Sequence, residues 1–285
     1  MVVLITGANG QLGQSLKHVA SNYQEIQYIF CDSKSLDITN LENCKSIFYH
    51  YKPQYCINAA AYTAVDRAES EPQKAHLINA IGAQNLAVVC KKYHTVLFHV
   101  STDFVFDGEK NTPYGENDIP NPTGVYGQTK LDGENAIQAV FDEYFILRTS
   151  WVYSQFGSNF MKTMLRLASE RDSLSIVNDQ VGTPTNALDL ANALLKMIDF
   201  QHKHSSKERY GIYNFSNEGQ CSWFEFAQKI FEINTIQIDL EPIPTSSYPT
   251  SAKRPVYSVL DKTKIKNTFG LEIKNWEDSL KTITI

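Results

Sequence analysis

Tyr126 and Lys130 are the first two side chains whose types and spacing suggest chemistry, because a phenol and an amine lie four residues apart. In a helix this spacing places both groups on one face. An ammonium about 4 Å from the phenol, in a partly screened site, contributes about 4 kcal/mol, or about three pKa units, in favour of the phenolate. The pair is therefore predicted to lower the pKa of Tyr126 to about 7 and to make it a proton donor. The same spacing is also common on solvent-exposed helix faces.

A glycine-rich turn near the N-terminus has the composition of a phosphate-binding loop. It joins an apolar run to a segment with helical periodicity and reads Gly7-Ala8-Asn9-Gly10-Gln11-Leu12-Gly13. Glycines there permit a tight turn and let backbone N–H groups approach a pyrophosphate, which the partial positive charge of a helix N-terminus also attracts. The spacing is GxxGxxG rather than GxGxxG. A plain loop is the alternative, but the flanking strand and helix favour a dinucleotide site.

Asp32 lies at the end of the second predicted strand, about 20 residues beyond this turn. A carboxylate at that place can accept a hydrogen bond from a ribose 2′-hydroxyl and repels a 2′-phosphate. Lys34 is close enough in the sequence to soften that preference. A plain turn residue is the alternative for Asp32.

Short apolar runs alternate with amphipathic segments through the first 180 residues. The runs predict strands at residues 2–6, 26–32, 55–60, 95–101, 144–150 and 174–178. Helical periodicity between them predicts two apolar helix faces, one with Leu12, Leu16 and Val19 and another with Leu77, Ile81 and Val88. The alternation predicts an α/β fold with a Rossmann-type, doubly wound parallel sheet covered on both faces.

The pattern changes after Asp179. A helix is predicted at 188–198, a strand at 210–215 and another helix from Ser222, followed by a proline-rich stretch. We expect residues 1–150 to form the dinucleotide-binding Rossmann domain, with part of 174–215 returning to it. Residues 151–173 and 216–285 are expected to form a smaller α/β region that binds the substrate.

The composition limits the class of protein. A chain of 285 residues with 42% hydrophobic and 20% charged residues is ordinary for a globular protein with a sizeable core. The net charge of -5 and the pI near 5.8, without a basic cluster, argue against binding of nucleic acid. No apolar window approaches the roughly 18 residues of a transmembrane helix, and no cationic leader precedes the first apolar run. A soluble, cytoplasmic protein without a membrane partner is expected.

The five cysteines and seven histidines show neither a disulfide framework nor metal-ligand spacing. The cysteines are odd in number, lie mostly in apolar segments and include no CxxC pair, which fits a reducing compartment. His99 lies inside an apolar strand and is expected to be a core residue with satisfied hydrogen bonds. No metal site is predicted.

Six stretches occur in the order typical of one enzyme family. They are NAAAYTAVDRAESE (58–71), STDFVFDG (101–108), VYGQTKLDGE (125–134), RTSWVY (148–153), NFMKTMLRL (159–167) and NDQVGTPT (178–185). With the glycine-rich turn they cover most of the first 190 residues. The chain resembles the extended short-chain dehydrogenases/reductases and, among them, the dTDP-4-dehydrorhamnose reductases most closely. The last 70 residues match only loosely.

The resemblance implies an NAD(P)H-dependent oxidoreductase, using NADH or NADPH, that reduces the C4 ketone of dTDP-4-dehydro-L-rhamnose to dTDP-L-rhamnose for cell-surface polysaccharide. It implies that Tyr126 gives a proton to the developing alkoxide, while Lys130 lowers the phenol's pKa and holds the nicotinamide ribose. Thr102 would hydrogen-bond the sugar oxygen or the phenol. These roles suit the reaction because hydride arrival at a carbonyl builds negative charge on its oxygen.

The same resemblance implies further binding residues. Asp103 and Trp151 would line the sugar site, and Arg254 would bind the nucleotide diphosphate. Plainer roles are a strand-end cap for Thr102, a turn for Asp103 and a core aromatic for Trp151. The implied cofactor-binding residues are Gly7, Gly10, Gln11, Leu12, Gly13, Asp32, Asp37, Ile38, Ala59, Ala60, Ala61, Tyr62, Thr63, Val100, Tyr126 and Lys130.

One departure from the family concerns oligomerisation. Some members dimerise through a magnesium ion held by carboxylates at the start of the first helix and on the helix after the Pro-Thr motif, where this chain has Ser15 and Leu188. Asp189 is adjacent, but neighbouring residues of a helix point about 100° apart. We therefore expect a monomer or a weak homodimer.

Two alternatives to this function are open. A relative could keep the dinucleotide fold and regulate another enzyme without catalysis, but it would have no need of Tyr126, Lys130 and Thr102. The other alternative is a different nucleotide-sugar reductase, epimerase or dehydratase of the same superfamily. Dehydratases commonly have Asp-Glu beside the threonine, where this chain has Asp103-Phe104.

Overall fold

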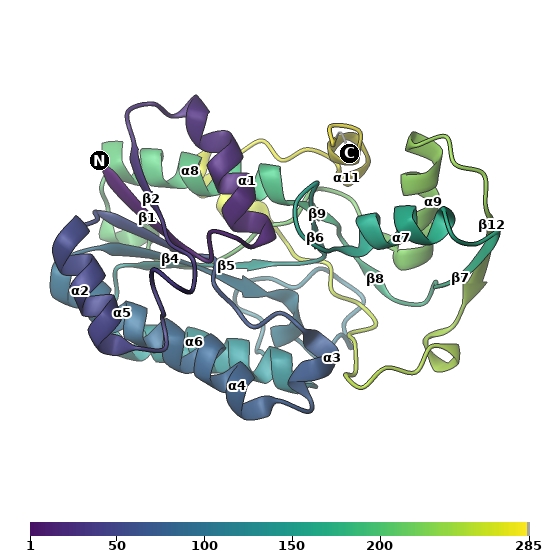
Figure 1. Ribbon diagram of the computed structural model, residues 1–285, viewed down its shortest axis with the longest axis horizontal. Helices are drawn as coiled ribbons and strands as arrows, with labels where there is room; N and C mark the ends of the chain where they lie inside the picture. The colour runs from purple at the N-terminus through teal and green to yellow at the C-terminus, as the bar shows by residue number, and fades with distance from the viewer. Residues whose placement is uncertain (284–285) are drawn as a thin grey trace.

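A six-stranded parallel sheet forms the centre of the computed structural model, which describes residues 1–283 (Figure 1). Its strands are β1 (Val2–Thr6), β2 (Gln27–Phe30), β3 (Tyr55–Asn58), β4 (Val96–Thr102), β5 (Tyr144–Thr149) and β10 (Gly211–Asn214). They lie in the order β10-β5-β4-β3-β1-β2, and every neighbouring pair is parallel. Parallel strands need crossover connections, so helices cover both faces.

Alternate residues of each strand divide the core into two layers. In β1, Ile5 packs with the first layer and Leu4 with the second. The first layer holds α1 (Gln11–Val19), α8 (Ala187–Lys203) and α10 (Thr263–Phe269), and the second holds α2 (Leu41–Tyr51), α5 (Gly82–Tyr93) and α6 (Val125–Val140). Figure 1 shows α1 and α8 above the sheet and α2, α5 and α6 below it.

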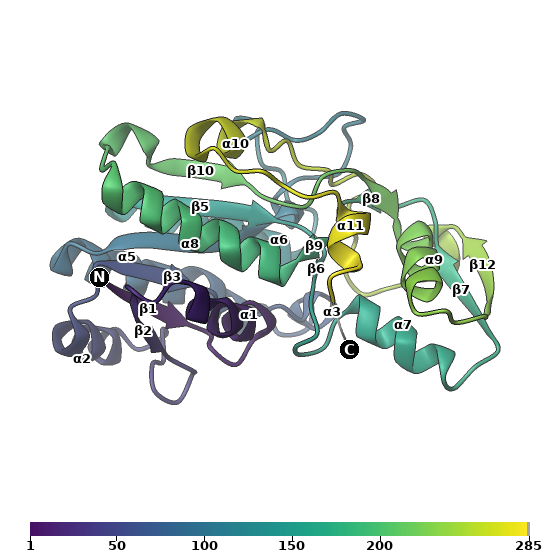
Figure 2. The same ribbon diagram turned by 90° about the horizontal axis from the view of Figure 1, so that it is seen from above.

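A smaller group of elements lies beyond the carboxyl ends of the strands (Figure 2). It contains α7 (Phe160–Ala168), α9 (Trp223–Ile233), α11 (Trp276–Leu280) and the parallel pair β7 (Ser173–Val177) and β12 (Asp239–Ile243). Its apolar core includes Tyr153, Met161, Phe226 and Ile230. Two short pairs connect it to the sheet, β6 (Val152–Tyr153) with β9 (Thr185–Asn186) and β8 (Val181–Gly182) with β11 (Cys221–Ser222).

Short helices complete the chain between these elements. After β3 come α3 (Val65–Ala68), α4 (Pro72–His76) and a π-helical stretch, η2 (Leu77–Ile81), which leads directly into α5. Single 3₁₀ turns lie at η1 (Ala20–Asn22), η3 (Asp103–Val105), η4 (Lys207–Arg209) and η5 (Thr245–Ser247). Within residues 1–283, no helix is both long and apolar enough to cross a membrane.

The predicted α/β fold with a Rossmann-type parallel sheet is confirmed. The strands predicted between residues 2 and 150 all lie in the sheet, with ends that differ by at most two residues. The strand predicted at 174–178 forms as β7 but pairs with β12 outside the sheet, while β10 takes the sixth place. A short apolar run shows that a strand forms and not which partner it finds. The domain boundaries stay a prediction.

The apolar face predicted for the third helix is wrong. Leu77 is 45% exposed, and the buried residues of α5 are instead Ala83, Leu86, Ala87, Val89 and Cys90. One reason is the π-helical stretch η2, whose wider turn shifts the phase of the helix that follows. Another is that α5 contacts α2 and α6 as well as β4, so its burial is not confined to one face.

Candidate active site

The glycine-rich turn joins β1 to α1 and packs against the chain after β3. Gly7 has a φ of +66°, and a Cβ there would lie 2.7 Å from backbone atoms of Ala59 and Ala60. A Cβ on Gly13 would collide with the carbonyl oxygen of Gly7, so only glycine fits these positions. Gly10 caps α1 without a side-chain hydrogen bond. Because the first N–H groups of a helix have no intrahelical partner, this end of α1 fits a dinucleotide pyrophosphate.

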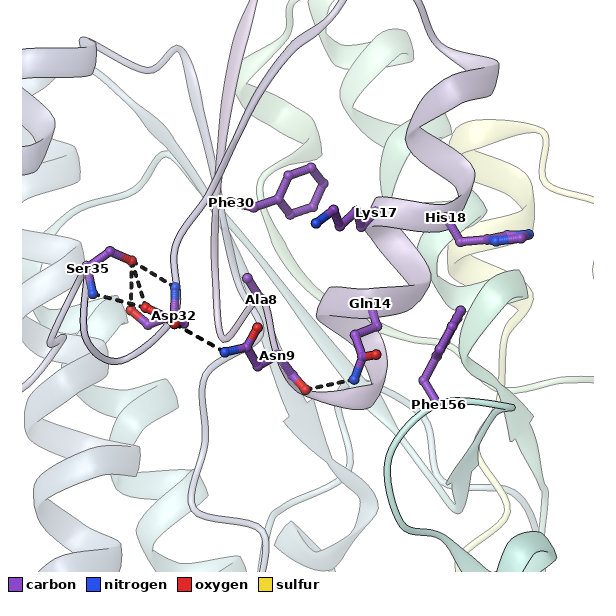
Figure 3. A pocket seen from close by; sticks show the side chains of 9 residues that line it. All are labelled: Ala8, Asn9, Gln14, Lys17, His18, Phe30, Asp32, Ser35 and Phe156. Carbon is purple, nitrogen blue, oxygen red and sulfur yellow. Dashed lines mark hydrogen bonds between the residues drawn. The ribbon is translucent and has the colours of Figure 1, made fainter.

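Asp32 follows β2 and lines a cavity of about 660 Å³ beside this turn (Figure 3). Its Oδ1 accepts the backbone N–H groups of Lys34 (3.1 Å) and Ser35 (3.0 Å), and its Oδ2 accepts Asn9 Nδ2 (3.1 Å). The hydrogen bonds from Ser35, above all, hold the pKa of Asp32 below its ordinary value. This ionised carboxylate suits a ribose hydroxyl better than a phosphate. The cavity is lined by Ala8, Asn9, Gln14, Lys17, His18, Phe30, Asp32, Ser35 and Phe156.

The structure brings Tyr126, Lys130 and Thr102 together at the carboxyl end of β4. Tyr126 lies in the first turn of α6, where the ring of Phe104 contacts its ring edge-on with centroids 5.5 Å apart. Lys130 lies one turn further on and is buried against β4. Thr102 is the last residue of β4, close enough for its hydroxyl to act on the pKa of the phenol.

The predicted lowering of the Tyr126 pKa is wrong for this arrangement. Desolvation raises the pKa of Tyr126 to about 12, and the Asp103 carboxylate adds to the rise while the Thr102 hydroxyl opposes it. The phenol therefore keeps its proton at neutral pH.

Lys130 does not direct its amine to the phenol. Its Nζ donates to the carbonyl oxygen of Val100 (2.7 Å) and lies 3.3 Å from His99 Nε2, both on β4. Burial lowers the pKa of Lys130 to about 8, with the Glu134 carboxylate opposing. Helical spacing predicts the shared face correctly, but it does not determine which partner a long, flexible side chain reaches.

Asp103 is a buried carboxyl group beside Thr102. The Thr102 hydroxyl donates to its Oδ1 (3.0 Å), whereas its buried Oδ2 has no hydrogen-bond partner among residues 1–283. Burial raises the pKa of Asp103 to about 6. The Ser258 hydroxyl opposes this rise from nearby without making a hydrogen bond to the carboxyl group, and the Thr102 hydroxyl opposes it through its bond to Oδ1. A buried polar atom without a partner is rare in folded proteins, and it fits a group that hydrogen-bonds a ligand.

Trp151, predicted to line the sugar site, stacks on Trp223 at the start of α9. The ring centroids are 3.5 Å apart and the planes differ by 8°. Trp151 has a φ of +46°, a left-handed conformation that is strained for a bulky residue. Such strain persists only where the surroundings impose it, and it is concentrated at functional sites.

Arg254, predicted to bind the diphosphate, pairs with Asp66 of α3 through an Nη2–Oδ2 contact of 2.6 Å. It also lines a second cavity of about 740 Å³ within the smaller group of elements. This cavity is bordered by α7, β7, the start of α9 and the loop after β12, and aromatic rings of Phe160, Trp223 and Tyr248 contribute to its wall.

The other predicted cofactor-binding residues follow β2 and β3 at the same edge of the sheet. Asp37 accepts the backbone N–H of Thr39 (2.9 Å), and Ile38 is buried. The segment after β3 contains Ala59, Ala60, Ala61, Tyr62 and Thr63, of which Ala59 and Ala60 contact the glycine-rich turn. Ligands of open α/β sheets bind at the carboxyl ends of the strands. Their contacts with a cofactor stay a prediction.

Two core residues behind the site have a role that the sequence pattern does not reveal. His99 is buried with its Nδ1 2.9 Å from Asn58 Nδ2 and its Nε2 beside Lys130. Asn79 holds α6 in a similar way, because its Nδ2 donates to Thr129 Oγ1 (3.1 Å). The available signal is a polar residue inside an otherwise apolar segment, the strand β4 for His99 and the helical stretch η2 for Asn79. It marks a buried hydrogen-bond network without naming the partner.

Ser15 and Leu188 stand at the positions where the family resemblance implies metal-binding carboxylates, and the acidic residue next to Leu188 is Asp189. Asp189 accepts hydrogen bonds from Asn217 Nδ2 (2.8 Å) and from the Ser279 hydroxyl. In the described part of the chain, no group of three or more His, Cys, Asp or Glu side chains could hold a metal ion. The oligomeric state stays a prediction.

Comparisons with known proteins agree along the whole chain. The family model described as RmlD substrate binding domain matches residues 1–284. The dTDP-4-dehydrorhamnose reductase of Aggregatibacter actinomycetemcomitans is 43% identical over 99% of this chain and 97% of its own length. The solved enzyme of that name from Clostridium acetobutylicum has a TM-score of 0.93 at 42% identity, covering 99% of this chain and 97% of its own. The one from Bacillus anthracis, solved in complex with NADP, has a TM-score of 0.93 at 40% identity over 98% and 97%. This chain therefore belongs to the RmlD substrate-binding-domain family, that of the dTDP-4-dehydrorhamnose reductases.

Proposed function

We propose that the protein reduces the C4 ketone of dTDP-4-dehydro-L-rhamnose to dTDP-L-rhamnose, with NADH or NADPH as cofactor, in the synthesis of cell-surface polysaccharide. The observation that carries the proposal is the meeting of Tyr126, Lys130 and Thr102 at the carboxyl end of β4, at the same sheet edge as the glycine-rich turn. Membership of the reductase family supports it along the full chain.

The cofactor supplies a hydride, and the chain supplies a proton and hydrogen bonds to the oxygen that becomes an alkoxide. Tyr126 is protonated at neutral pH and can give its proton to that oxygen. The Thr102 hydroxyl donates to Asp103 Oδ1 in the structure, and by turning from it to the substrate it can donate a second hydrogen bond that strengthens as negative charge develops. Lys130, when it is charged and turned towards the phenol, stabilises the tyrosinate that remains.

The cavity of about 740 Å³ suits the nucleotide half of the substrate. Flat rings such as those of Trp223, Phe160 and Tyr248 can stack on a base, and a guanidinium such as that of Arg254 pairs bidentately with phosphate oxygens. Its lining comes mostly from the predicted substrate-binding region at 151–173 and 216–285. The diphosphate has to replace Asp66 as the partner of Arg254.

Asp103 and Trp151 are proposed to select the sugar. Hydride transfer requires reacting atoms about 3 to 3.5 Å apart. A ring with two inverted centres, seated between the unpaired Asp103 oxygen and Trp151, places C4 differently relative to the nicotinamide. The protein should therefore reduce the L-sugar and not the D-sugar that precedes 3,5-epimerisation.

A coupled assay with the protein, NADH and dTDP-4-keto-6-deoxy sugar, with and without a 3,5-epimerase, tests the function and the selectivity together. We expect NADH oxidation only with the epimerase, and a product two mass units heavier than the ketone in the mass spectrum. Equal oxidation in both arms would contradict the selectivity. Cofactor binding without oxidation in either arm would favour the alternative of a non-catalytic regulatory subunit, and an unreduced isomer as product would favour an epimerase.

A further inference from the structure

The hydrogen-bond partners of His99 and Lys130 determine which of their nitrogens carry hydrogens. His99 is 1% exposed, and its two ring nitrogens lie 2.9 Å from Asn58 Nδ2 and 3.3 Å from Lys130 Nζ. A neutral imidazole has one N–H donor and one acceptor. The tautomer of His99 therefore decides what Lys130 faces.

Asn58 determines that tautomer. Its Oδ1 accepts the backbone N–H of Ala60 (3.2 Å) and the hydroxyl of Thr6 (2.7 Å). The Ala60 N–H also reaches Thr6 Oγ1 at 3.2 Å. A flipped amide would still place its NH₂ group 3.2 Å from this N–H, donor against donor, whereas the amide as placed gives Ala60 and Thr6 a shared acceptor. The Asn58 NH₂ group must then face His99, where it can only donate. His99 Nδ1 is therefore the acceptor, and the ring proton is on Nε2.

Lys130 consequently faces a donor. An ammonium group has three N–H bonds and no lone pair, so it would oppose the Nε2–H of His99 at 3.3 Å. A neutral amine can accept that hydrogen and still donate to the Val100 carbonyl oxygen at 2.7 Å. Lys130 is 1% exposed, so water cannot easily relieve a clash between two donors. The neutral amine is the form that completes this network.

We propose that His99 is a positioning residue that donates its Nε2–H to Lys130, so that Lys130 is neutral before cofactor binds and gains a proton as it turns towards Tyr126. The inference rests on the proposed function, in which a charged Lys130 stabilises the tyrosinate. It adds a step to that function, because cofactor binding then includes the uptake of a proton.

The charged and titratable groups around Lys130 agree with this assignment. His99 faces it from β4, and Glu134 and Tyr126 lie one turn away on its own helix. Glu134 favours the ammonium form, but its carboxylate is already bound by Arg148 at 2.6 Å. Among the described residues, the polar side chain that reaches His99 from β3 is the uncharged amide of Asn58.

The pKa directions place the change of charge near neutral pH. Burial lowers the pKa of Lys130 to about 8. A hydrogen bond donated to the amine favours its neutral form further. Burial, the larger cause, lowers the pKa of His99 well below its ordinary value, so the imidazole stays neutral beside a neutral Lys130.

The first test reads the His99 tautomer in the wild-type protein. Long-range ¹H–¹⁵N correlation spectra of ¹⁵N-histidine-labelled protein at about pH 8 distinguish protonated from unprotonated ring nitrogens. We expect the His99 signals, identified by their loss in His99→Gln, to show a protonated Nε2 and a bare Nδ1. An Nδ1–H tautomer or an imidazolium pattern would overturn the inference.

The second test measures the proton. Calorimetric titration of the protein with NADH at about pH 8, in two buffers of different ionisation enthalpy, gives the number of protons taken up. We expect uptake of close to one proton in wild type. His99→Gln offers an amide oxygen that can accept from an ammonium, so uptake should fall towards zero while NADH still binds. His202→Gln is the matched control, since exposed His202 contacts Tyr55 rather than the site.

The outcomes separate this inference from the proposed function. Wild-type binding without proton uptake, or unchanged uptake in His99→Gln, would overturn the inference even if the sugar is reduced. The expected tautomer and uptake, without reduction of the sugar, would leave it standing and refute the proposed function. If His99→Gln does not fold, the tautomer and the proton uptake of the wild-type protein still test the inference. The histidine signals are then assigned by their contacts to neighbouring residues.

Discussion

The carboxylate of Asp66 binds the guanidinium of Arg254 through two hydrogen bonds, Nη2–Oδ2 at 2.6 Å and Nη1–Oδ1 at 3.1 Å. The same carboxylate accepts the backbone N–H of Ala252 at 3.1 Å. These bonds tie the loop after β12 to α3, in the half of the molecule that holds the catalytic residues. They also occupy the nitrogens with which Arg254 would bind a diphosphate.

Asp66→Asn should therefore tighten substrate binding. The pair is partly exposed, so it is worth only about 0.2 to 1 kcal/mol. Releasing it should lower KM for the nucleotide sugar by about 1.4- to 5-fold with kcat unchanged, whereas Arg254→Gln should raise KM. Steady-state kinetics, with exposed Asp142→Asn as control, shows whether Asp66 competes with the substrate for Arg254 or positions Arg254 for it. A higher KM in Asp66→Asn would show that Asp66 positions Arg254 instead of competing for it.

Tyr126→Phe should reduce kcat by roughly 10²- to 10⁴-fold, because it removes the acid while leaving the ring. NADH should bind as before, which fluorescence titration can measure separately from turnover. Tyr49→Phe, a change at an exposed tyrosine of α2, is the control and should behave as wild type. Near-wild-type turnover of Tyr126→Phe, when chemistry limits the rate, would exclude the phenol as the acid.

Asp32 should make NADH at least comparable to NADPH as a cofactor, because its ionised carboxylate accepts from a ribose hydroxyl and repels a 2′-phosphate. Asp32→Asn should shift the ratio of kcat/KM values towards NADPH, and Asp142→Asn should not. The check is kcat/KM for both cofactors in all three proteins. A hundredfold advantage of NADPH in wild type would refute the assignment of Asp32.

Asp103 should make the stability depend on pH. Its pKa is about 6 in the folded protein and about 3.9 in an unfolded chain. Between these values the folded protein keeps the proton that the unfolded chain has lost, so the free energy of unfolding falls as pH rises from about 4 to about 6. The fall should be about 2 to 3 kcal/mol. Urea unfolding of wild type and Asp103→Asn across this range isolates the effect, and parallel curves would contradict it.

Chelation should change neither activity nor mass in solution, because Ser15 and Leu188 offer no carboxylate for the magnesium ion that the family resemblance implies. Light scattering and turnover, before and after dialysis against EDTA, measure both. A dimer that dissociates on chelation and re-forms with Mg²⁺ would show that other residues supply a metal bridge.

The parts of the site that depend on local pattern are predictable from the sequence. The glycine-rich turn, Asp32 after β2 and Tyr126 at the start of α6 each follow from neighbouring residues, because strand and helix periodicity place them at one sheet edge. The parts that depend on distant partners are not. Lys130 is held by residues of β4 about 30 positions earlier, and β7 pairs with a strand 66 positions later. Burial, which reverses the expected shift of the Tyr126 pKa, is likewise a property of the whole fold.

The stack of Trp151 on Trp223 also gives the protein an optical signal of its own. These are two of its three tryptophans, and at a centroid separation of 3.5 Å their electronic excitations are coupled. Trp276 is not part of the stack and absorbs as a separate chromophore. Because Trp151 follows β5 and Trp223 begins α9, the exciton band in circular dichroism reports whether the smaller group of elements is docked on the sheet. Thermal loss of this docking can thus be followed without any label.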